Sequence, residues 1–170
     1  MRVIAGQHKG RRLRSPPGAR PTADRVKEAL FSILGDRVPG ARVLDLFAGS
    51  GALGIEALSR GAAEATFVDD DERAIRTIRA NLEGAAAIRR DAVSFLRSAS
   101  DQYDLVFLDP PYRLAERYGR ELSEPIAAVL APGGTVVSES DRRTPLDLPD
   151  LALVDERRYG DTLIRLHASH

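Results

Sequence analysis

The sequence predicts an α/β fold in which one doubly wound sheet of seven strands is mostly parallel. Two observations carry this prediction. From residue 42 onward, short apolar segments alternate with segments whose apolar residues recur at helical spacing. The last two apolar segments are joined only by the tight turn Tyr159-Gly160-Asp161, so that pair must be antiparallel. The length of 170 residues fits one domain over residues 1–170.

The boundaries of the expected elements follow from the apolar runs and from the glycine and proline residues that end them. Gly61 ends the helix after the first strand, and Pro132-Gly133-Gly134 closes the long helix before the fifth strand. The expected strands cover residues 42–47, 65–68, 86–89, 105–108, 135–139, 151–158 and 162–167. The helices between them cover residues 52–60, 72–82, 92–98 and roughly 114–130.

The first 38 residues are expected to form a small extension on the core of residues 39–170. Residues 1–14 alternate loosely and contain two turn-forming glycines, which favours a short basic hairpin. The prolines of residues 15–18 indicate a loop. Thr22 is placed to cap a helix over residues 23–34.

The charge of the chain is divided unevenly. Residues 1–27 carry eight basic side chains and one acidic side chain, a charge of +7, and the remaining 143 residues carry −7. A basic arm on an acidic body is typical of a protein that meets a polyanion through one end. A solvated charged terminus would explain the same pattern.

Composition excludes several classes of site. The chain has no cysteine, so it has no disulfide, thiolate metal site or cysteine nucleophile. Its three histidines, His8, His167 and His170, lack metal-ligand spacing, and we expect no metal. No apolar run approaches the roughly 20 residues of a membrane helix, and there is no signal peptide. We therefore expect a cytoplasmic protein with no membrane partner.

A glycine-rich loop follows the first expected strand. Gly49-Ser50-Gly51-Ala52-Leu53-Gly54 is a literal GxGxxG between a strand and a helix, where glycines allow a tight turn and close approach of a ligand. Asp69, at the end of the second expected strand, suits a ribose hydroxyl. These features fit both NAD and S-adenosylmethionine. A purely structural glycine turn is the alternative.

Asp45 distinguishes between these two possible cofactors. It lies inside the first expected strand, where a carboxylate costs several kcal/mol unless it finds a partner. A dinucleotide-binding strand is normally apolar at this depth, whereas S-adenosylmethionine has an ammonium group that would pair with Asp45. Asp45 could instead bond to local backbone groups or to an arginine. Asp91, after the third strand, suits the adenine amino group and equally suits the N-cap of the next helix.

The segment Asp109-Pro110-Pro111-Tyr112 follows the fourth expected strand, at the edge where open α/β sheets bind ligands. An exocyclic amine of a nucleobase is a poor nucleophile because its lone pair is delocalised into the ring. The Asp109 carboxylate and the Pro110 carbonyl could accept its two N–H groups and localise that lone pair. Tyr112 offers a ring on which the base stacks. A plain strand-ending turn is the alternative.

These blocks, in this order, resemble the class I amino-methyltransferases, and the two ends of the chain resemble the RsmD family. The family consists of bacterial methyltransferases that modify the N2 amine of one guanine in small-subunit (16S) ribosomal RNA. The blocks that carry this resemblance are Arg2-Val3-Ile4-Ala5-Gly6, Lys9-Gly10-Arg11, Arg20-Pro21-Thr22, Asp24 to Phe31 and Arg158-Tyr159-Gly160-Asp161-Thr162. The resemblance covers nearly the whole chain and implies a Rossmann-like class I methyltransferase fold.

The resemblance also implies roles for individual residues. Those implied for S-adenosylmethionine are Asp45, Phe47, Gly49, Gly51, Asp69, Asp70, Asp91, Ala92 and Asp109. Asp109, Pro110, Pro111 and Tyr112 would hold the guanine. Those implied for RNA are Arg2, Lys9, Arg11, Arg20, Thr22 and Arg25. One departure is an aspartate run, residues 69–71, where the family usually has glutamate, which leaves open whether Asp69 or Asp70 contacts the ribose.

The sequence leaves several alternatives open. An amino-methyltransferase of adenine or cytosine, in DNA or another RNA, would use the same reacting centre, but it normally needs an added region to read a groove. A protein glutamine methyltransferase is expected to carry asparagine in place of Asp109. A nicotinamide oxidoreductase leaves Asp45 unexplained, and a non-enzymatic RNA-binding module explains only the arm. The sequence indicates a monomer, and it does not decide between free ribosomal RNA and the assembled small subunit, nor which group takes the proton.

Overall fold

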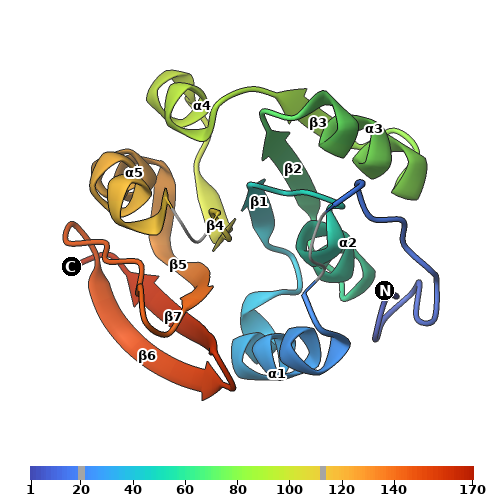
Figure 1. Ribbon diagram of the computed structural model, residues 1–170, viewed down its shortest axis with the longest axis horizontal. Helices are drawn as coiled ribbons and strands as arrows, with labels where there is room; N and C mark the ends of the chain where they lie inside the picture. The colour runs from blue at the N-terminus through green and yellow to red at the C-terminus, as the bar shows by residue number, and fades with distance from the viewer. Residues whose placement is uncertain (19–21, 112–113) are drawn as a thin grey trace.

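A seven-stranded sheet crosses the molecule in the order β3-β2-β1-β4-β5-β7-β6 (Figure 1). The computed structural model describes residues 1–18, 22–111 and 114–170. Strands β1 to β5 pair with one another in parallel, and β7 is antiparallel to both β5 and β6, as the sequence predicts. The strands are β1 Arg42–Leu46, β2 Glu64–Asp69, β3 Ala86–Arg89, β4 Tyr103–Leu108, β5 Leu130–Asp141, β6 Ala152–Tyr159 and β7 Thr162–Ala168.

Helices cover both faces of the sheet (Figure 1). The α-helices are α1 Asp24–Leu34, α2 Ala52–Ser59, α3 Glu72–Asn81, α4 Ala92–Ser98 and α5 Ala115–Val129, and a 3-10 turn η1 spans Gly35–Arg37. Helices α1, α2 and α3 bury their apolar sides with Phe67 and Phe107 on one face, and α4 and α5 bury theirs with Leu46 and Val106 on the other. This alternation of strand side chains makes two separate cores. No described helix is both long and apolar enough to cross a membrane.

The strand register brings one row of side chains to the carboxyl edge of the sheet. Asp45 of β1 is aligned with Phe67 of β2 and Phe107 of β4, and Phe107 is aligned with Val137 of β5. Because side chains alternate along a strand, the residues two positions further along lie on the same face and one step nearer this edge. On β2, β4 and β5 these positions are Asp69, Asp109 and Glu139, whereas Phe47, just after the end of β1, turns its ring toward the opposite face. The parallel register therefore gathers acidic groups where ligands of open α/β sheets bind.

Two local expectations are wrong. Thr22 does not cap α1, because the N-cap is Ala23 and makes no side-chain capping bond. The Thr22 hydroxyl instead donates to Glu139 Oε2 at 3.3 Å. Strand β5 begins at Leu130, directly after α5, and not at residue 135, because Leu130 already pairs with Tyr103 of β4. In both cases a contact distant in sequence overrides the local signal.

The N-terminal arm, residues 1–14, folds back on itself and packs against the core. Its expected hairpin consists of an antiparallel bridge between Arg2 and Arg12. The Glu56 carboxylate of α2 accepts the backbone N–H groups of Ile4 at 2.8 Å and Ala5 at 3.1 Å. Gly6, at φ +84°, has no room for a side chain, since a Cβ would lie 1.9 Å from the Ser59 carbonyl oxygen. The arm is therefore fixed against the end of α2.

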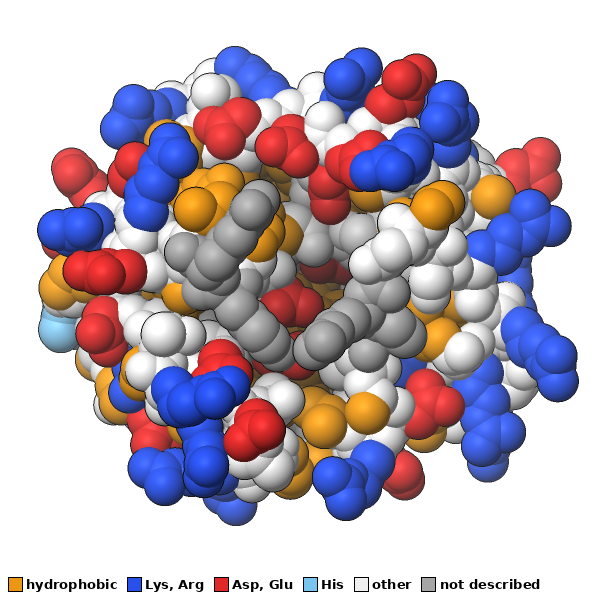
Figure 2. All heavy atoms as spheres, viewed as in Figure 1, with side chains coloured by type: hydrophobic (Ala, Val, Ile, Leu, Met, Phe, Trp, Pro, Cys, Tyr) orange, Lys and Arg blue, Asp and Glu red, His pale blue; other side chains and the backbone are white. Residues whose placement is uncertain are grey.

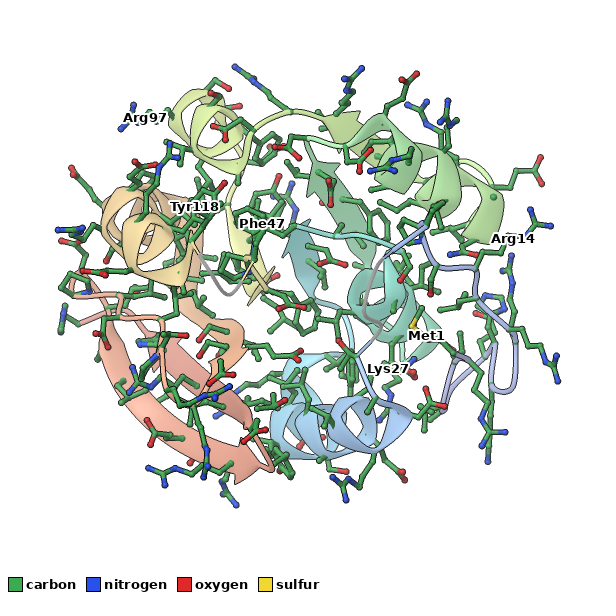
Figure 3. All side chains as sticks on the ribbon, in the orientation of Figure 1. Met1, Arg14, Lys27, Phe47, Arg97 and Tyr118 are labelled. Atoms are coloured by element: carbon green, nitrogen blue, oxygen red, sulfur yellow. The ribbon has the colours of Figure 1, made fainter. Side chains whose placement is uncertain are left out.

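A buried ion pair completes this contact. The Lys27 ammonium of α1 lies 3.3 Å from Glu56 Oε1, both side chains are fully buried, and the ammonium also donates to the Arg2 carbonyl (Figure 3). Arg60 Nε donates to Glu56 Oε2 at 3.0 Å. These partners, together with the two backbone N–H groups, hold the pKa of Glu56 below its usual value despite burial. Lys27, one of the eight basic residues counted among residues 1–27, is therefore not available to a polyanion.

Candidate active site

A cavity of about 670 Å³ opens at the carboxyl edge of the sheet, over the ends of β1, β2, β4 and β5. Figure 2 shows a hollow at the centre of this face with acidic side chains inside it, and lysine and arginine side chains toward the margin. Among the described residues that line the cavity, no side chain is lysine, arginine or histidine. Its acidic residues are Asp45, Asp69, Asp70, Asp109 and Glu139. This charge distribution favours a cationic ligand.

The glycine loop turns between β1 and α2 and forms one wall of the cavity. Gly49 and Gly51 have φ of +58° and +79°, in the left-handed region that favours glycine. Phe47 adopts φ +55°, which is unusual for a residue with a side chain and stores local strain. Its ring packs edge-on against Tyr118 of α5, with centroids 4.9 Å apart (Figure 3). Backbone strain of this kind clusters at ligand sites, and Phe47 and Gly49 both line the cavity.

Asp45 lies at the bottom of this loop. The residue is 2% exposed, and its Oδ2 accepts the Gly54 N–H of α2 at 3.0 Å. Burial, opposed by the Gly54 hydrogen bond and assisted by the charge of Asp69, raises the pKa of Asp45 to about 8. The local backbone partner considered from the sequence is thus present, and one hydrogen bond does not offset the burial of the charge. An ammonium group paired with Asp45 would offset this cost of burial.

The aspartate run after β2 supports the loop as well as the cavity. Asp69 Oδ2 accepts the Gly49 N–H at 3.0 Å, and its Oδ1 accepts the Asp71 N–H at 2.9 Å. Burial raises the pKa of Asp69 above its ordinary value, against these two hydrogen bonds. Asp71 caps α3 by accepting the Arg73 N–H at 2.8 Å. Both Asp69 and Asp70 line the cavity, so either carboxylate can reach a ligand there.

Asp109, Pro110 and Pro111 form the opposite wall, at the end of β4. Burial, followed by the charges of Glu139 and Asp45, raises the pKa of Asp109 well above its usual range. The Pro111 carbonyl accepts the Leu114 N–H at 2.9 Å, which leaves the Pro110 carbonyl as the more suitable second acceptor for a substrate amine.

Glu139 is a cavity residue that the sequence analysis missed. It lies near the end of β5, and burial raises its pKa despite the hydrogen bond from Thr22. A glutamate as the last residue of the expected strand of residues 135–139 was a usable signal, because it stands at the carboxyl edge of the sheet, where open α/β sheets bind ligands. Its partner across the sheet, Asp109, could be named only once the register was known.

Not all of the other residues predicted for the site line the cavity. Asp91 and Ala92 are not among the residues that line the cavity. Asp91 instead caps α4, with its Oδ2 3.0 Å from the Ser94 N–H, as one of its two interpretations expected. Tyr112 and Arg20 lie outside the described residues. Thr22 borders the cavity, and the remaining RNA candidates are exposed: Arg2, Lys9, Arg11 and Arg25.

The matching sequence family is described as "Conserved hypothetical protein 95" and covers residues 1–168. The chain belongs to this family, the RsmD family. RsmD-family relatives include the "Putative rRNA methyltransferase YlbH" of Bacillus subtilis, 39% identical over 98% of this chain and 98% of the relative. The "Ribosomal RNA small subunit methyltransferase D" of Escherichia coli K12 is 41% identical over 82% of this chain and 71% of the relative.

Solved structures show the same architecture for this RsmD-family chain. The "Putative methyltransferase yhhF from Escherichia coli" superposes with a TM-score of 0.83 at 34% identity, over 100% of this chain and 98% of the other. A hypothetical protein of Thermus thermophilus gives 0.86 at 32% identity, over 99% of each chain. The class I methyltransferase fold predicted from the sequence is confirmed.

S-adenosylmethionine, the cofactor predicted from the sequence, fits this cavity. Both its ammonium and its sulfonium are cations, and the lining offers carboxylates without a competing basic side chain among the described residues. Burial leaves Asp45 with a raised pKa that a cation would lower. The left-handed glycines let the backbone approach a ligand closely, and the N-terminus of α2 favours the negatively charged carboxylate of its amino-acid part.

Proposed function

We propose that this chain transfers a methyl group from S-adenosylmethionine to the exocyclic N2 amine of a guanine in small-subunit (16S) ribosomal RNA. The observation that carries the proposal is the position of Asp109. It directly follows β4 and lines the same cavity as Asp45, together with Pro110 and Pro111. The names of the RsmD-family relatives, rRNA methyltransferase and small subunit methyltransferase D, support the choice of RNA.

The cofactor site is proposed from the wall formed by β1, β2 and the glycine loop. Asp45 would pair with the ammonium group, Gly49 and Gly51 would give their backbone to the methionyl part, and Asp69 or Asp70 would accept ribose hydroxyls. The proposed adenine contacts are Phe47, Asp91 and Ala92. When bound, the cofactor supplies a methyl group on a positively charged sulfur, and Asp109 would hold the substrate amine that receives it.

The chain's own contribution to methyl transfer is the preparation of the amine. Asp109 and the Pro110 carbonyl would each accept one N–H group of the amine, which localises its lone pair toward the methyl group. Two consecutive prolines restrict the backbone, so the Pro110 carbonyl is held in place before the substrate arrives. Tyr112 would stack on the base. This is catalysis by positioning and electrostatics, with no covalent intermediate on the protein.

The RNA surface is proposed on the extension of residues 1–38. Ser15, Pro16, Gly18 and Thr22 line the cavity, so the chain that follows the basic arm forms part of its wall. The exposed arginines and lysine of the arm would contact phosphates, with affinity that falls steeply as salt rises. The target base must be unpaired or flipped out to reach Asp109. The proposed RNA contacts are Arg2, Lys9, Arg11, Arg20, Thr22 and Arg25.

Labelled methyl transfer tests this proposal. Small ribosomal subunits from cells that lack the activity are incubated with the protein and labelled S-adenosylmethionine, and the modified nucleoside is mapped. We expect N2-methylguanosine at one position, and loss of about a hundredfold or more in rate for Asp109→Ala. The exposed Asp150, which lies outside both the cavity lining and residues 1–38, supplies a matched control, Asp150→Ala, with unchanged rate. Label in adenine, cytosine, DNA or protein, or full activity of Asp109→Ala, would refute the assignment.

Two further parts of the proposal are the state of the RNA substrate and the oligomeric state of the enzyme. Naked 16S RNA and intact small subunits, compared as substrates, separate free RNA from the assembled particle. We expect a monomeric cytoplasmic enzyme, and a single-subunit mass in light scattering at the assay concentration checks the first of these properties. A stable dimer would contradict it.

A further inference from the structure

Glu139 lies beside Asp109 on the side of the cavity away from the proposed cofactor wall. Leu108 of β4 is aligned with Ser138 of β5, so the next residues on the two strands, Asp109 and Glu139, are neighbours. Parallel strands are about 5 Å apart, and residues at equal register project to the same face. Both side chains line the cavity, and Asp45 and Asp69 belong to β1 and β2 on the other side of β4.

Thr22 fixes one oxygen of this glutamate. The Thr22 hydroxyl donates to Glu139 Oε2 at 3.3 Å and therefore orients the carboxylate from the loop before α1. The other oxygen, Oε1, can face a ligand. No described basic side chain lines the cavity to neutralise the two neighbouring carboxyls. In the free protein, burial and their mutual charge raise the pKa of Asp109, and burial raises that of Glu139.

Two adjacent acceptors in one pocket favour a ligand with two adjacent donors. Guanine has this pattern on its Watson–Crick edge, where the N1–H group stands next to the N2 amine. Adenine and cytosine have a lone pair, at N1 and N3 respectively, next to their exocyclic amines. A carboxylate opposite such a lone pair is left without a partner and repelled, which is costly in a partly buried site.

We propose that Glu139 determines base specificity by accepting the N1–H of the target guanine while Asp109 accepts from its N2 amine. This inference rests on the proposed function, and it adds the group that selects guanine. The exocyclic amine alone does not distinguish the three bases, so Asp109 and Pro110 need such a partner. Rejection of a base that lacks the N1 donor then arises from an unpaired buried carboxylate.

The test uses 2-aminopurine, which keeps the 2-amino group but has a lone pair at N1. Small subunits are reconstituted with guanine or 2-aminopurine at the mapped position, and the wild type is compared with Glu139→Gln. The wild type should prefer guanine by at least roughly tenfold, since a hydrogen bond to a charged group is involved. Glu139→Gln should shift this preference toward 2-aminopurine by at least roughly tenfold, because an amide N–H can donate to the N1 lone pair.

Controls separate specificity from folding and from the underlying reaction. Binding of S-adenosylhomocysteine should be equal in the wild type, in Glu139→Gln and in the exposed control Glu124→Gln, and Glu124→Gln should keep the wild-type preference. A wild type that forms no N2-methylguanosine overturns the proposed function. A wild type that forms it but methylates both bases equally, or a Glu139→Gln variant that slows both equally, overturns only the role of Glu139. Even if the variant does not fold, equal methylation of the two bases by the wild type still overturns the role of Glu139.

Discussion

Replacement of Asp45 by asparagine should stabilise the free protein at neutral and alkaline pH while weakening cofactor binding. Asp45 is 2% exposed, and burial raises its pKa from an ordinary 3.8 to about 8. Asparagine has nearly the same shape and retains an oxygen that can accept the Gly54 N–H. The substitution therefore removes the buried charge and leaves the hydrogen bond in place.

The sign and size of the effect follow from linkage between protonation and folding. Because the pKa of Asp45 is higher in the folded than in the unfolded chain, the folded state holds the proton longer. The contribution of Asp45 to the free energy of unfolding is fully present below about pH 4 and is lost as the pH rises to about 8. At 1.36 kcal/mol per pKa unit, the loss is roughly 6 kcal/mol at most. The Asp45→Asn variant does not undergo this loss. Its free energy of unfolding therefore exceeds that of the wild type by an amount that grows from pH 4 to pH 8.

The assay is urea denaturation of the ligand-free protein at several pH values between 4 and 8. The difference in unfolding free energy between variant and wild type reports the charge of Asp45, including its effect on the neighbouring Asp109. The exposed Asp36 supplies the control Asp36→Asn, which should show no such trend. A difference that does not change with pH, or a variant that is less stable at pH 8, would show that the buried charge of Asp45 does not destabilise the free protein. Calorimetry should show S-adenosylhomocysteine binding weakened roughly tenfold to a hundredfold, since a charge-assisted hydrogen bond is lost.

Two further predictions concern the arm contact and the glycine loop. Lys27→Met should destabilise the protein by about 3 kcal/mol in urea denaturation, since it leaves the Glu56 carboxylate buried without its ammonium partner; wild-type stability would show that the ion pair is dispensable. Gly51→Ala should be less stable than Gly49→Ala in the same assay, because its Cβ would lie 3.2 Å from Phe67 whereas that of Gly49 meets open space. Equal stability of the two alanine variants would contradict this account.

Elements whose signals are local were predicted closely. Strand β3 and helix α4 have the expected boundaries, because the apolar spacing and the Asp91 cap lie within or beside the element itself. The start of β5 at Leu130 was missed because it depends on pairing with Tyr103, on a different strand. The expected cap by Thr22 failed for the same kind of reason, since its partner, Glu139, is 117 residues away.

The sequence alone predicted the fold class, the glycine loop and two acidic residues, Asp45 and Asp109, that both line the cavity. Each rests on a pattern within a few residues: alternation of strand and helix, a GxGxxG turn, or an acid placed in or after an apolar strand. Only the tertiary structure decided that Glu139 and Thr22 join Asp109, and that Lys27 is buried against Glu56. Such contacts depend on strand order and register, which set which distant residues become neighbours and which charges lose water.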